Sequence, residues 1–268
     1  MSLVATAWMA NPNDCYPARF IDQLTGCLNL KPFPQPGDPG LLSDTGYVQL
    51  LGLLQQEYHL TTEKVQFSEK SFCFTRVTNP DDLPLDLNEE GQLKWQPYWA
   101  EDWQSSRALC RLVLERKVRN QSILDLGCGL GLTAAVAACE GAAVTLADNA
   151  QPALLFSEIN CWRWKENCRF ELLDWKEEHP ALGRYDIILG AEIIYDSQDW
   201  NDLERFWKNH VARGGRVLLC DPFRRTGKEF REWILGRKWE VNCRDLKIPE
   251  FLTAINVIEL SPGFQISH

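Results

Sequence analysis

The stretch "ILDLGCGLGLTAAV", residues 123–136, constrains the fold of this chain more than any other. An apolar run typical of a buried strand leads into closely spaced glycines, and a helix-forming run follows. Glycines at such a turn let the backbone come close to a bound ligand. The stretch therefore predicts a strand, a ligand-binding turn and a helix, in that order.

From residue 95 onward the chain alternates predicted strands and helices, which is typical of an α/β fold with a mostly parallel, doubly wound sheet. Helices are expected at 98–117, 130–140, 151–165, 198–211 and 226–237. Strands are expected at 121–126, 143–148, 168–173, 185–192, 215–221, 239–245 and 252–260. The sheet would have seven strands, and its last two would follow each other without a helix between them.

Before residue 95 the pattern differs. Residues 1–60 are rich in proline and contain one helical segment, "GYVQLLGLLQQEYH", so we expect a partly helical N-terminal extension. Residues 61–94 combine alternating stretches at 64–78, which predict short strands, with the proline-rich and acidic linker "NPDDLPLDLNEEGQ". The main domain would cover residues 95–268, and 268 residues suit one large domain with an extension.

Composition narrows the possible partners and the compartment. A net charge of −9 disfavours a broad surface for nucleic-acid phosphates. The 10 cysteines form no C-x-x-C pair, and we expect them to be reduced in a cytoplasmic protein without a signal peptide. No apolar run reaches the roughly 18 residues of a membrane span. The 4 histidines lie outside the motifs, so neither a metal site nor a histidine triad is expected.

The turn itself favours a cationic ligand over a phosphate. Leu132 stands both where a dinucleotide turn needs its third glycine and where a phosphate-binding loop needs its lysine. Asp125, two residues before the first glycine, would repel a pyrophosphate and attract a sulfonium or ammonium group. S-adenosylmethionine carries both cations, and its carboxylate suits a helix N-terminus. The predicted contacts in the turn are Asp125, Gly127, Cys128, Gly129 and Gly131.

Two more acidic positions extend this prediction. Asp148 ends the second strand and is followed by Asn149, a place where a carboxylate can accept both hydroxyls of a ribose. The alternative is that Asp148 only caps the next helix. Asp174 and Trp175 follow the third strand, where they could contact the adenine amino group and ring. They could also be a solvated acid beside a buried tryptophan.

These residues, together with "YDIILGAEIIYD" (185–196), resemble the class I, seven-β-strand methyltransferases that use S-adenosylmethionine. More narrowly, "QPYWAEDWQSSRAL" (96–109) and "LLCDPFRR" (218–225) resemble the protein-lysine methyltransferase-like family, which includes the enzyme acting on the electron-transfer flavoprotein β-subunit. The resemblance implies a Rossmann-like fold, S-adenosylmethionine as cofactor and a lysine acceptor. It also places Trp103 beside the methionine part of the donor.

The end of the fourth strand carries the predicted catalytic residues. Methyltransferases of base or amide nitrogens have a proline loop here, which this chain lacks. The family pattern is D-x-x-Y, and this chain has Glu192 and Tyr195. Glu192 could orient the acceptor amine or take its proton. The alternative is that Glu192 pairs with a surface base while Tyr195 is half buried.

Trp99 and Trp103 lie four residues apart and would share one face of the helix expected at 98–117, with Trp99 in the core. Three functions remain open from the sequence. A protein-lysine N-methyltransferase is the leading one. A small-molecule N-methyltransferase and a non-catalytic module that binds the donor and a protein partner are the alternatives. In each of them no nucleic acid or membrane is expected.

Overall fold

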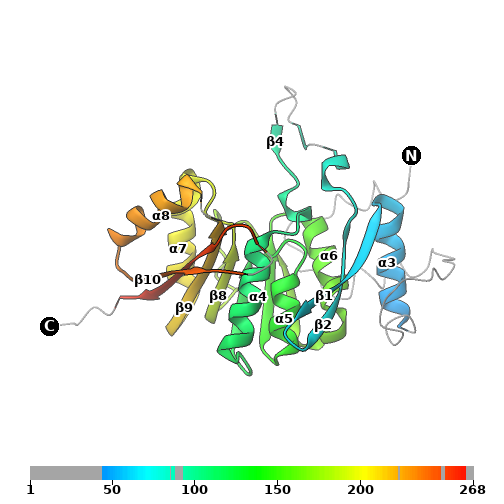
Figure 1. Ribbon diagram of the computed structural model, residues 1–268, viewed down its shortest axis with the longest axis horizontal. Helices are drawn as coiled ribbons and strands as arrows, with labels where there is room; N and C mark the ends of the chain where they lie inside the picture. The colour runs from blue at the N-terminus through cyan, green and yellow to red at the C-terminus, as the bar shows by residue number, and fades with distance from the viewer. Residues whose placement is uncertain (1–43, 85, 88–92, 223, 249–250, 264–268) are drawn as a thin grey trace.

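A seven-stranded sheet forms the centre of the computed structural model, which describes residues 44–84, 86–87, 93–222, 224–248 and 251–263 (Figure 1). The strands are β5 (Ser122–Leu126), β6 (Ala143–Asp148), β7 (Cys168–Leu172), β8 (Tyr185–Ala191), β9 (Val211–Pro222), β10 (Trp239–Leu246) and β11 (Ile255–Pro262). Their order in the sheet is β10-β11-β9-β8-β5-β6-β7. In this sheet β9, β8, β5, β6 and β7 run parallel to one another. Strand β11 runs antiparallel to both of its neighbours, β9 and β10. The predicted mostly parallel seven-stranded sheet is confirmed.

Helices cover both faces of this sheet, as a doubly wound fold requires (Figure 1). They are α4 (Gln104–Arg116), α5 (Leu132–Cys139), α6 (Gln151–Cys161), α7 (Trp200–His210) and α8 (Arg225–Leu235). Alternate residues of each strand contribute to two separate cores. Ile123 packs with α4, α5 and α6, whereas Leu124 packs with α7 and α8. This alternation fixes which side chains reach each face.

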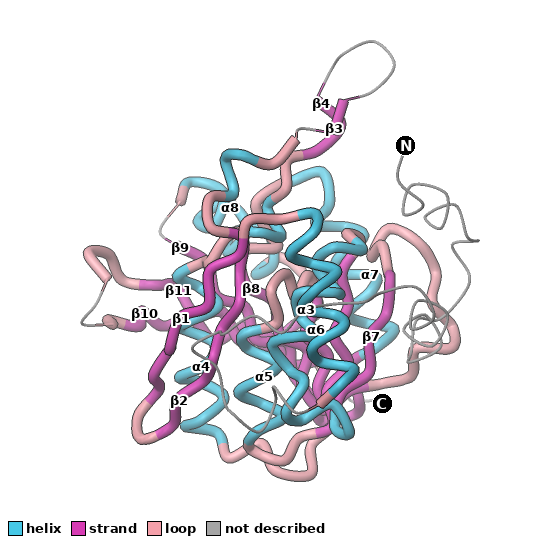
Figure 2. The backbone as a smooth tube through the Cα atoms, turned by 90° about the vertical axis from the view of Figure 1, so that its right-hand side faces the viewer, coloured by secondary structure: helices cyan, strands magenta, loops and turns pink. Residues whose placement is uncertain are grey.

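Three elements before the sheet pack on its α6 side. They are α3 (Thr45–Glu57), β1 (Leu60–Phe67) and β2 (Lys70–Val77), and the last two form an antiparallel hairpin (Figure 2). The Tyr47 and Trp162 rings meet edge-on at 5.9 Å, and Asp44 caps α3 by accepting from the Gly46 amide at 3.0 Å. Residues 1–43 of the expected extension lie outside the described residues.

Two expectations about element boundaries were wrong. The helix expected from residue 98 begins at Gln104, because a 3-10 turn at Tyr98–Ala100 ends in an extended Glu101. Trp99 and Trp103 therefore do not share a helix face. The helix expected to reach residue 165 ends at Cys161, and a 3-10 segment with a non-helical Trp164 follows it.

The expected linker also contains some structure. A 3-10 turn covers Pro80–Asp82, and the short strands β3 (Asp86–Leu87) and β4 (Leu93–Trp95) pair antiparallel and project away from the sheet (Figure 2). The cysteines of the described part are free. Within that same part of the chain, no helix is both long and apolar enough to pass through a membrane.

Candidate active site

A cavity of about 510 Å³ opens at the carboxyl ends of β5, β6 and β8. The chain reverses its direction of travel through the sheet between β5 and β8, and ligands of open α/β sheets bind at such points. The cavity brings together most residues predicted for the donor and both predicted for the acceptor. They are Gly127, Cys128, Gly129, Gly131, Asp148, Asn149, Trp175, Trp103, Glu192 and Tyr195.

The glycine turn after β5 is held in place by the neighbouring strand. The amides of Gly127 and Cys128 both donate to the Ala147 carbonyl, at 2.8 and 3.0 Å. Gly131 has a φ of +76°, and a Cβ there would lie 2.6 Å from the Cβ of Ser157 on α6. Only glycine satisfies both conditions, so α5 and α6 can pack closely below the turn.

Asp148 joins the turn to the next helix. One of its carboxylate oxygens accepts from the Gly129 amide and the other from the Ala150 amide, both at 2.9 Å. Asp148 does not cap the following helix, because the N-cap of α6 is Ala150 and no side chain bonds to the free amides of that helix start. Asp148 lines the cavity instead and retains lone pairs for a ligand. Burial raises the pKa of Asp148 to about 6, although the backbone amides that it accepts from oppose the rise. Its contact with the ribose stays a prediction.

Asp125 and Asp174 lie outside the residues that line the cavity. Asp125 is buried and interacts with the Ala134 amide in the first turn of α5, and burial raises its pKa to about 7. Asp174 is half buried and accepts from the Lys176 amide at 2.9 Å. Direct donor contacts by these two acids stay predictions. Beside them, the indole N–H of Trp175 is buried without a hydrogen-bond partner among the described residues, so it is available to a ligand.

The other end of the cavity contains Glu192. Its backbone has a φ of +56°, which is unusual for a residue with a side chain and is typical of constrained functional positions. Its amide donates to the Cys220 carbonyl at 2.9 Å, and its carboxylate lies 2.7 Å from the Arg224 guanidinium. Burial raises the pKa of Glu192, while Arg224 and Ser105 oppose the rise. The predicted pairing with a base is therefore observed, and the base belongs to the cavity wall.

Aromatic side chains form the mouth of the cavity beside Glu192. The Tyr98 ring lies 5.8 Å from the Tyr195 ring and 6.1 Å from the Trp103 ring, and Tyr98 and Tyr195 are 45% and 42% exposed. The Trp103 indole donates to the Tyr98 carbonyl at 2.9 Å, and the Arg224 guanidinium lies over its ring. Trp99, in contrast, packs in the core, 5.4 Å from the Phe156 ring, as expected.

The β1–β2 hairpin contributes a wall that sequence reasoning missed. Phe74 of β2 lines the cavity. The Asn160 side chain of α6 accepts from the Thr75 amide at 2.7 Å and donates to the carbonyls of Thr75 and Leu130, both at 2.9 Å. The hairpin is thereby tied to the glycine turn. The pairing depends on contacts distant in sequence, so no local pattern indicated it.

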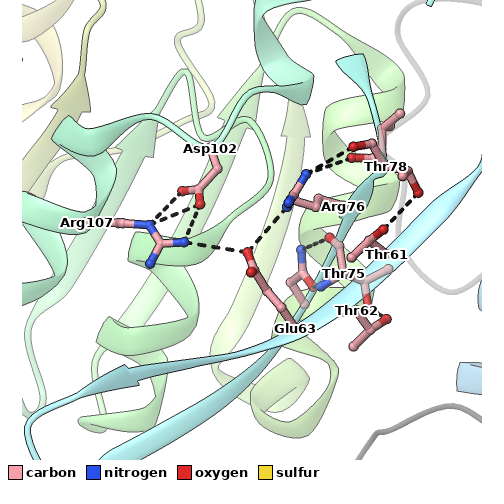
Figure 3. A network of polar contacts seen from close by, with 10 residues as sticks. Thr61, Thr62, Glu63, Thr75, Arg76, Thr78, Asp102 and Arg107 are labelled. Atoms are coloured by element: carbon pink, nitrogen blue, oxygen red, sulfur yellow. Dashed lines mark hydrogen bonds and ion pairs between the residues drawn. The ribbon is translucent and has the colours of Figure 1, made fainter. Parts of the chain in front are cut away.

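A second link joins the hairpin to Arg107 and, through it, to Asp102 (Figure 3). Glu63 of β1 lies 3.3 Å from Arg76 and 3.6 Å from Arg107, and Arg107 also pairs with Asp102 on the cavity wall. Arg224 and Tyr98 were missed as well. They lie in "LLCDPFRR" and "QPYWAEDWQSSRAL", the two stretches that carry the family resemblance. Among the described residues, no group of His, Cys, Asp and Glu could hold a metal ion.

Comparison with known proteins agrees with this geometry. Residues 96–234 match the model of a family described as "Lysine methyltransferase". The electron transfer flavoprotein beta subunit lysine methyltransferase of Rattus norvegicus is 36% identical over 133 residues, 48% of this chain and 51% of that protein. The protein N-lysine methyltransferase METTL21A of Xenopus tropicalis is 30% identical over 170 residues, 59% and 74% of the two chains. The match to the first relative thus spans about half of its length.

Solved structures share the fold. The ribosomal protein L11 methylase from Lactobacillus delbrueckii subsp. bulgaricus aligns with a TM-score of 0.52 and 14% identity, covering 75% of this chain and all of that one. The N-methyltransferase NodS from Bradyrhizobium japonicum WM9, in complex with S-adenosyl-l-homocysteine, aligns with a TM-score of 0.50 and 14% identity, covering 65% and 93%. At this level of identity the likeness concerns the fold alone.

Proposed function

Because the chain belongs to the lysine methyltransferase family, we propose that it transfers a methyl group from S-adenosylmethionine to a lysine side chain of a protein. One observation carries the proposal. A single cavity has the glycine turn and Asp148 at one end and the Glu192–Tyr195 pair at the other. A donor held at the first end would present its methyl group to an acceptor at the second.

The donor end fits the chemical groups of S-adenosylmethionine. Asp148 offers oxygens to the ribose. The indole N–H of Trp175, which has no partner within the described part of the chain, offers a donor. The glycine turn gives close access to the backbone at the start of α5. When bound, S-adenosylmethionine supplies a methyl group on a sulfonium, which is already a good leaving group. The protein therefore has to align the reactants and exclude water.

The acceptor lysine has to lose a proton before it can react, because an ammonium has no lone pair and cannot act as a nucleophile. Its pKa is near 10.4, so the side chain is protonated near neutral pH. The positive charge of a bound sulfonium close to the acceptor nitrogen disfavours the charged form of the amine. Glu192 binds the ammonium, orients its nitrogen and accepts the proton directly or through water. To do so it exchanges its Arg224 partner for the acceptor. An amine oriented in this way by Glu192 would form its N–C bond to the methyl group as the C–S bond breaks, and a thioether would remain.

A protein acceptor is favoured over a small molecule by the mouth of the cavity. Tyr98 and Tyr195 are both exposed there, so an extended chain can lie across them. The carboxylates of Glu101, Asp102 and Asp196 line the same cavity and suit a cationic side chain. The net charge of −9 disfavours a nucleic acid, and the free cysteines fit the reducing cytoplasm.

The test is incubation of the protein with a cell lysate and S-adenosylmethionine carrying a radiolabelled methyl group. We expect label in a protein band and, after hydrolysis, in methylated lysine. Label only in small molecules would favour the small-molecule enzyme, and no label would favour the non-catalytic module. Glu192→Gln protein serves as the matched control, because it should bind the donor and label the band far more slowly.

A further inference from the structure

A second buried carboxyl group, Asp221, lies next to Glu192 and has no part in the reaction described above. Ala191, the last residue of β8, pairs with Cys220 of β9. Glu192 directly follows Ala191, and Asp221 directly follows Cys220. The Glu192 amide also donates to the Cys220 carbonyl, at 2.9 Å. Asp221 is 1% exposed, and among the described residues neither of its carboxylate oxygens has a hydrogen-bond partner.

The residues that pack around Asp221 enclose its side chain, but they do not balance the negative charge of its carboxylate. A Cβ at Gly227, in the first turn of α8, would lie 2.4 Å from an Asp221 oxygen, so only glycine allows this approach. On the other side Asn256 of β11 stands opposite Asp221 in the ladder, and its own side-chain oxygen also lacks a partner within the described chain. Neither neighbour carries a charge. The charged groups that act on Asp221 are Glu192 and Arg224.

The charge count is therefore two buried carboxyl groups and one arginine. Arg224 pairs with Glu192 at 2.7 Å, and its side chain is 45% exposed, so water screens part of its charge. A second buried carboxylate would have no partner of its own, which is costly. Burial, and after it the charge of Glu192, raises the pKa of Asp221 to about 7, with Arg224 opposing. The two acids therefore titrate as a coupled pair with a single arginine beside them.

Resting on the proposed function, we propose that Asp221 is a positioning residue of the acceptor site, whose ionisation adds a second negative charge behind Glu192 and strengthens the binding of a cationic amine. The acceptor's own charge does not change near neutrality, since a primary ammonium titrates near 10.4. Any gain in its affinity between pH 6 and 8 must then come from the protein.

The first experiment uses n-butylammonium as a probe for the lysine side chain, with S-adenosylhomocysteine bound to the intact protein. Affinity is measured by NMR titration at about pH 6 and pH 8. We expect wild type to bind the probe about threefold or more tightly at the higher pH. Asp221→Asn should show a clearly smaller gain, which comes from Asp148 and Asp125 because these acids also ionise in this range. Asp245→Asn, an exposed acid on β10, is the matched control and should behave like wild type. An equal gain in Asp221→Asn would overturn the proposal.

A second measurement separates this role from a structural one. The protein is labelled with ¹³C at its aspartate carboxyl groups, and the Asp221 signal is identified as the one that is missing from Asp221→Asn. In wild type this signal should titrate near pH 7. It should move to lower pH in Glu192→Gln, because the neighbouring charge is gone. A signal that titrates near 4, or that ignores Glu192→Gln, contradicts the proposal. Absence of S-adenosylhomocysteine binding would instead refute the proposed function, and the carboxyl titration does not depend on that binding.

Discussion

Glu192 combines three features that rarely meet in one residue: a left-handed backbone, a buried carboxylate and an arginine partner at the edge of a cavity. The sequence placed it at the end of a strand, and the family pattern suggested its role. It could not reveal the Arg224 pair, because the two residues come from different loops. Nor could it reveal that Asp125 lies below the turn and outside the cavity lining.

For Glu192→Gln we expect unchanged donor affinity and methyl transfer slowed by about 100-fold, the low end for an orienting or proton-accepting group. The shape is kept while the charge that attracts and deprotonates the ammonium is lost, so the effect belongs to the transition state. Single-turnover transfer and a separate donor titration measure the two quantities. Glu192→Asp, which restores the family residue, should retain more activity than Gln. A wild-type rate in Glu192→Gln would make Glu192 structural.

Asp125 gives a prediction about pH and stability. Its pKa is about 7 in the folded protein and near 3.8 in an unfolded chain, so between these values the folded state binds more protons. The free energy of unfolding therefore loses a contribution from Asp125 as the pH rises from about 4 to 7. Asp125→Asn cannot titrate and should lose none. Urea denaturation at pH 4.5 and 7 measures the free energy of unfolding of both proteins. Relative to wild type, Asp125→Asn should be more stable at pH 7 than at pH 4.5. A constant difference would contradict the burial argument.

At the scale of elements, the sheet and its helices could be predicted because each strand and helix has its own hydrophobic periodicity and is bounded by turn-forming residues. The glycine turn after β5 and the two final strands are examples, since local residues determine both. The 3-10 turn at Tyr98–Ala100 could not be predicted, because apolar and polar residues continue through it at the spacing expected of an α-helix. The docking of the β1–β2 hairpin was also invisible, since it depends on Asn160, far away in the sequence.

Asn160→Ala tests that docking. It removes three hydrogen bonds between the hairpin, α6 and the glycine turn and leaves the Thr75 amide without its partner. We expect a loss of about 1–3 kcal/mol in the free energy of unfolding. Donor affinity should fall as well, because the Leu130 carbonyl is no longer held. Chemical denaturation and calorimetry measure these effects. Asn242→Ala, exposed on β10, is the control, and equal stability of the two variants would remove the hairpin from the site's support.

At the scale of the whole molecule, the two ends of the cavity differ in how they are assembled. The donor end comes from consecutive strand–turn–helix units, so its residues appear in the sequence as recognisable motifs. The acceptor end draws on Tyr98, Tyr195 and Arg224, which belong to three separate segments. No linear pattern connects them. The donor could therefore be predicted from the sequence in some detail, whereas the acceptor could be predicted only through the family resemblance.

Tyr98 tests whether this composite mouth recognises a protein. Tyr98→Ala removes an exposed ring that contacts both Tyr195 and Trp103, and it leaves the backbone carbonyl that accepts from the Trp103 indole. Because aromatic anchors dominate protein interfaces, we expect KM for the protein acceptor to rise about fivefold or more. Donor affinity should be unchanged. Leu235→Ala removes an exposed apolar side chain of α8 outside the cavity lining and is the control. Steady-state kinetics with the acceptor identified by labelling measures KM and kcat for both variants. If Tyr98→Ala and Leu235→Ala have the same KM, the acceptor does not bind across the tyrosines, and the argument for a protein substrate loses its structural basis.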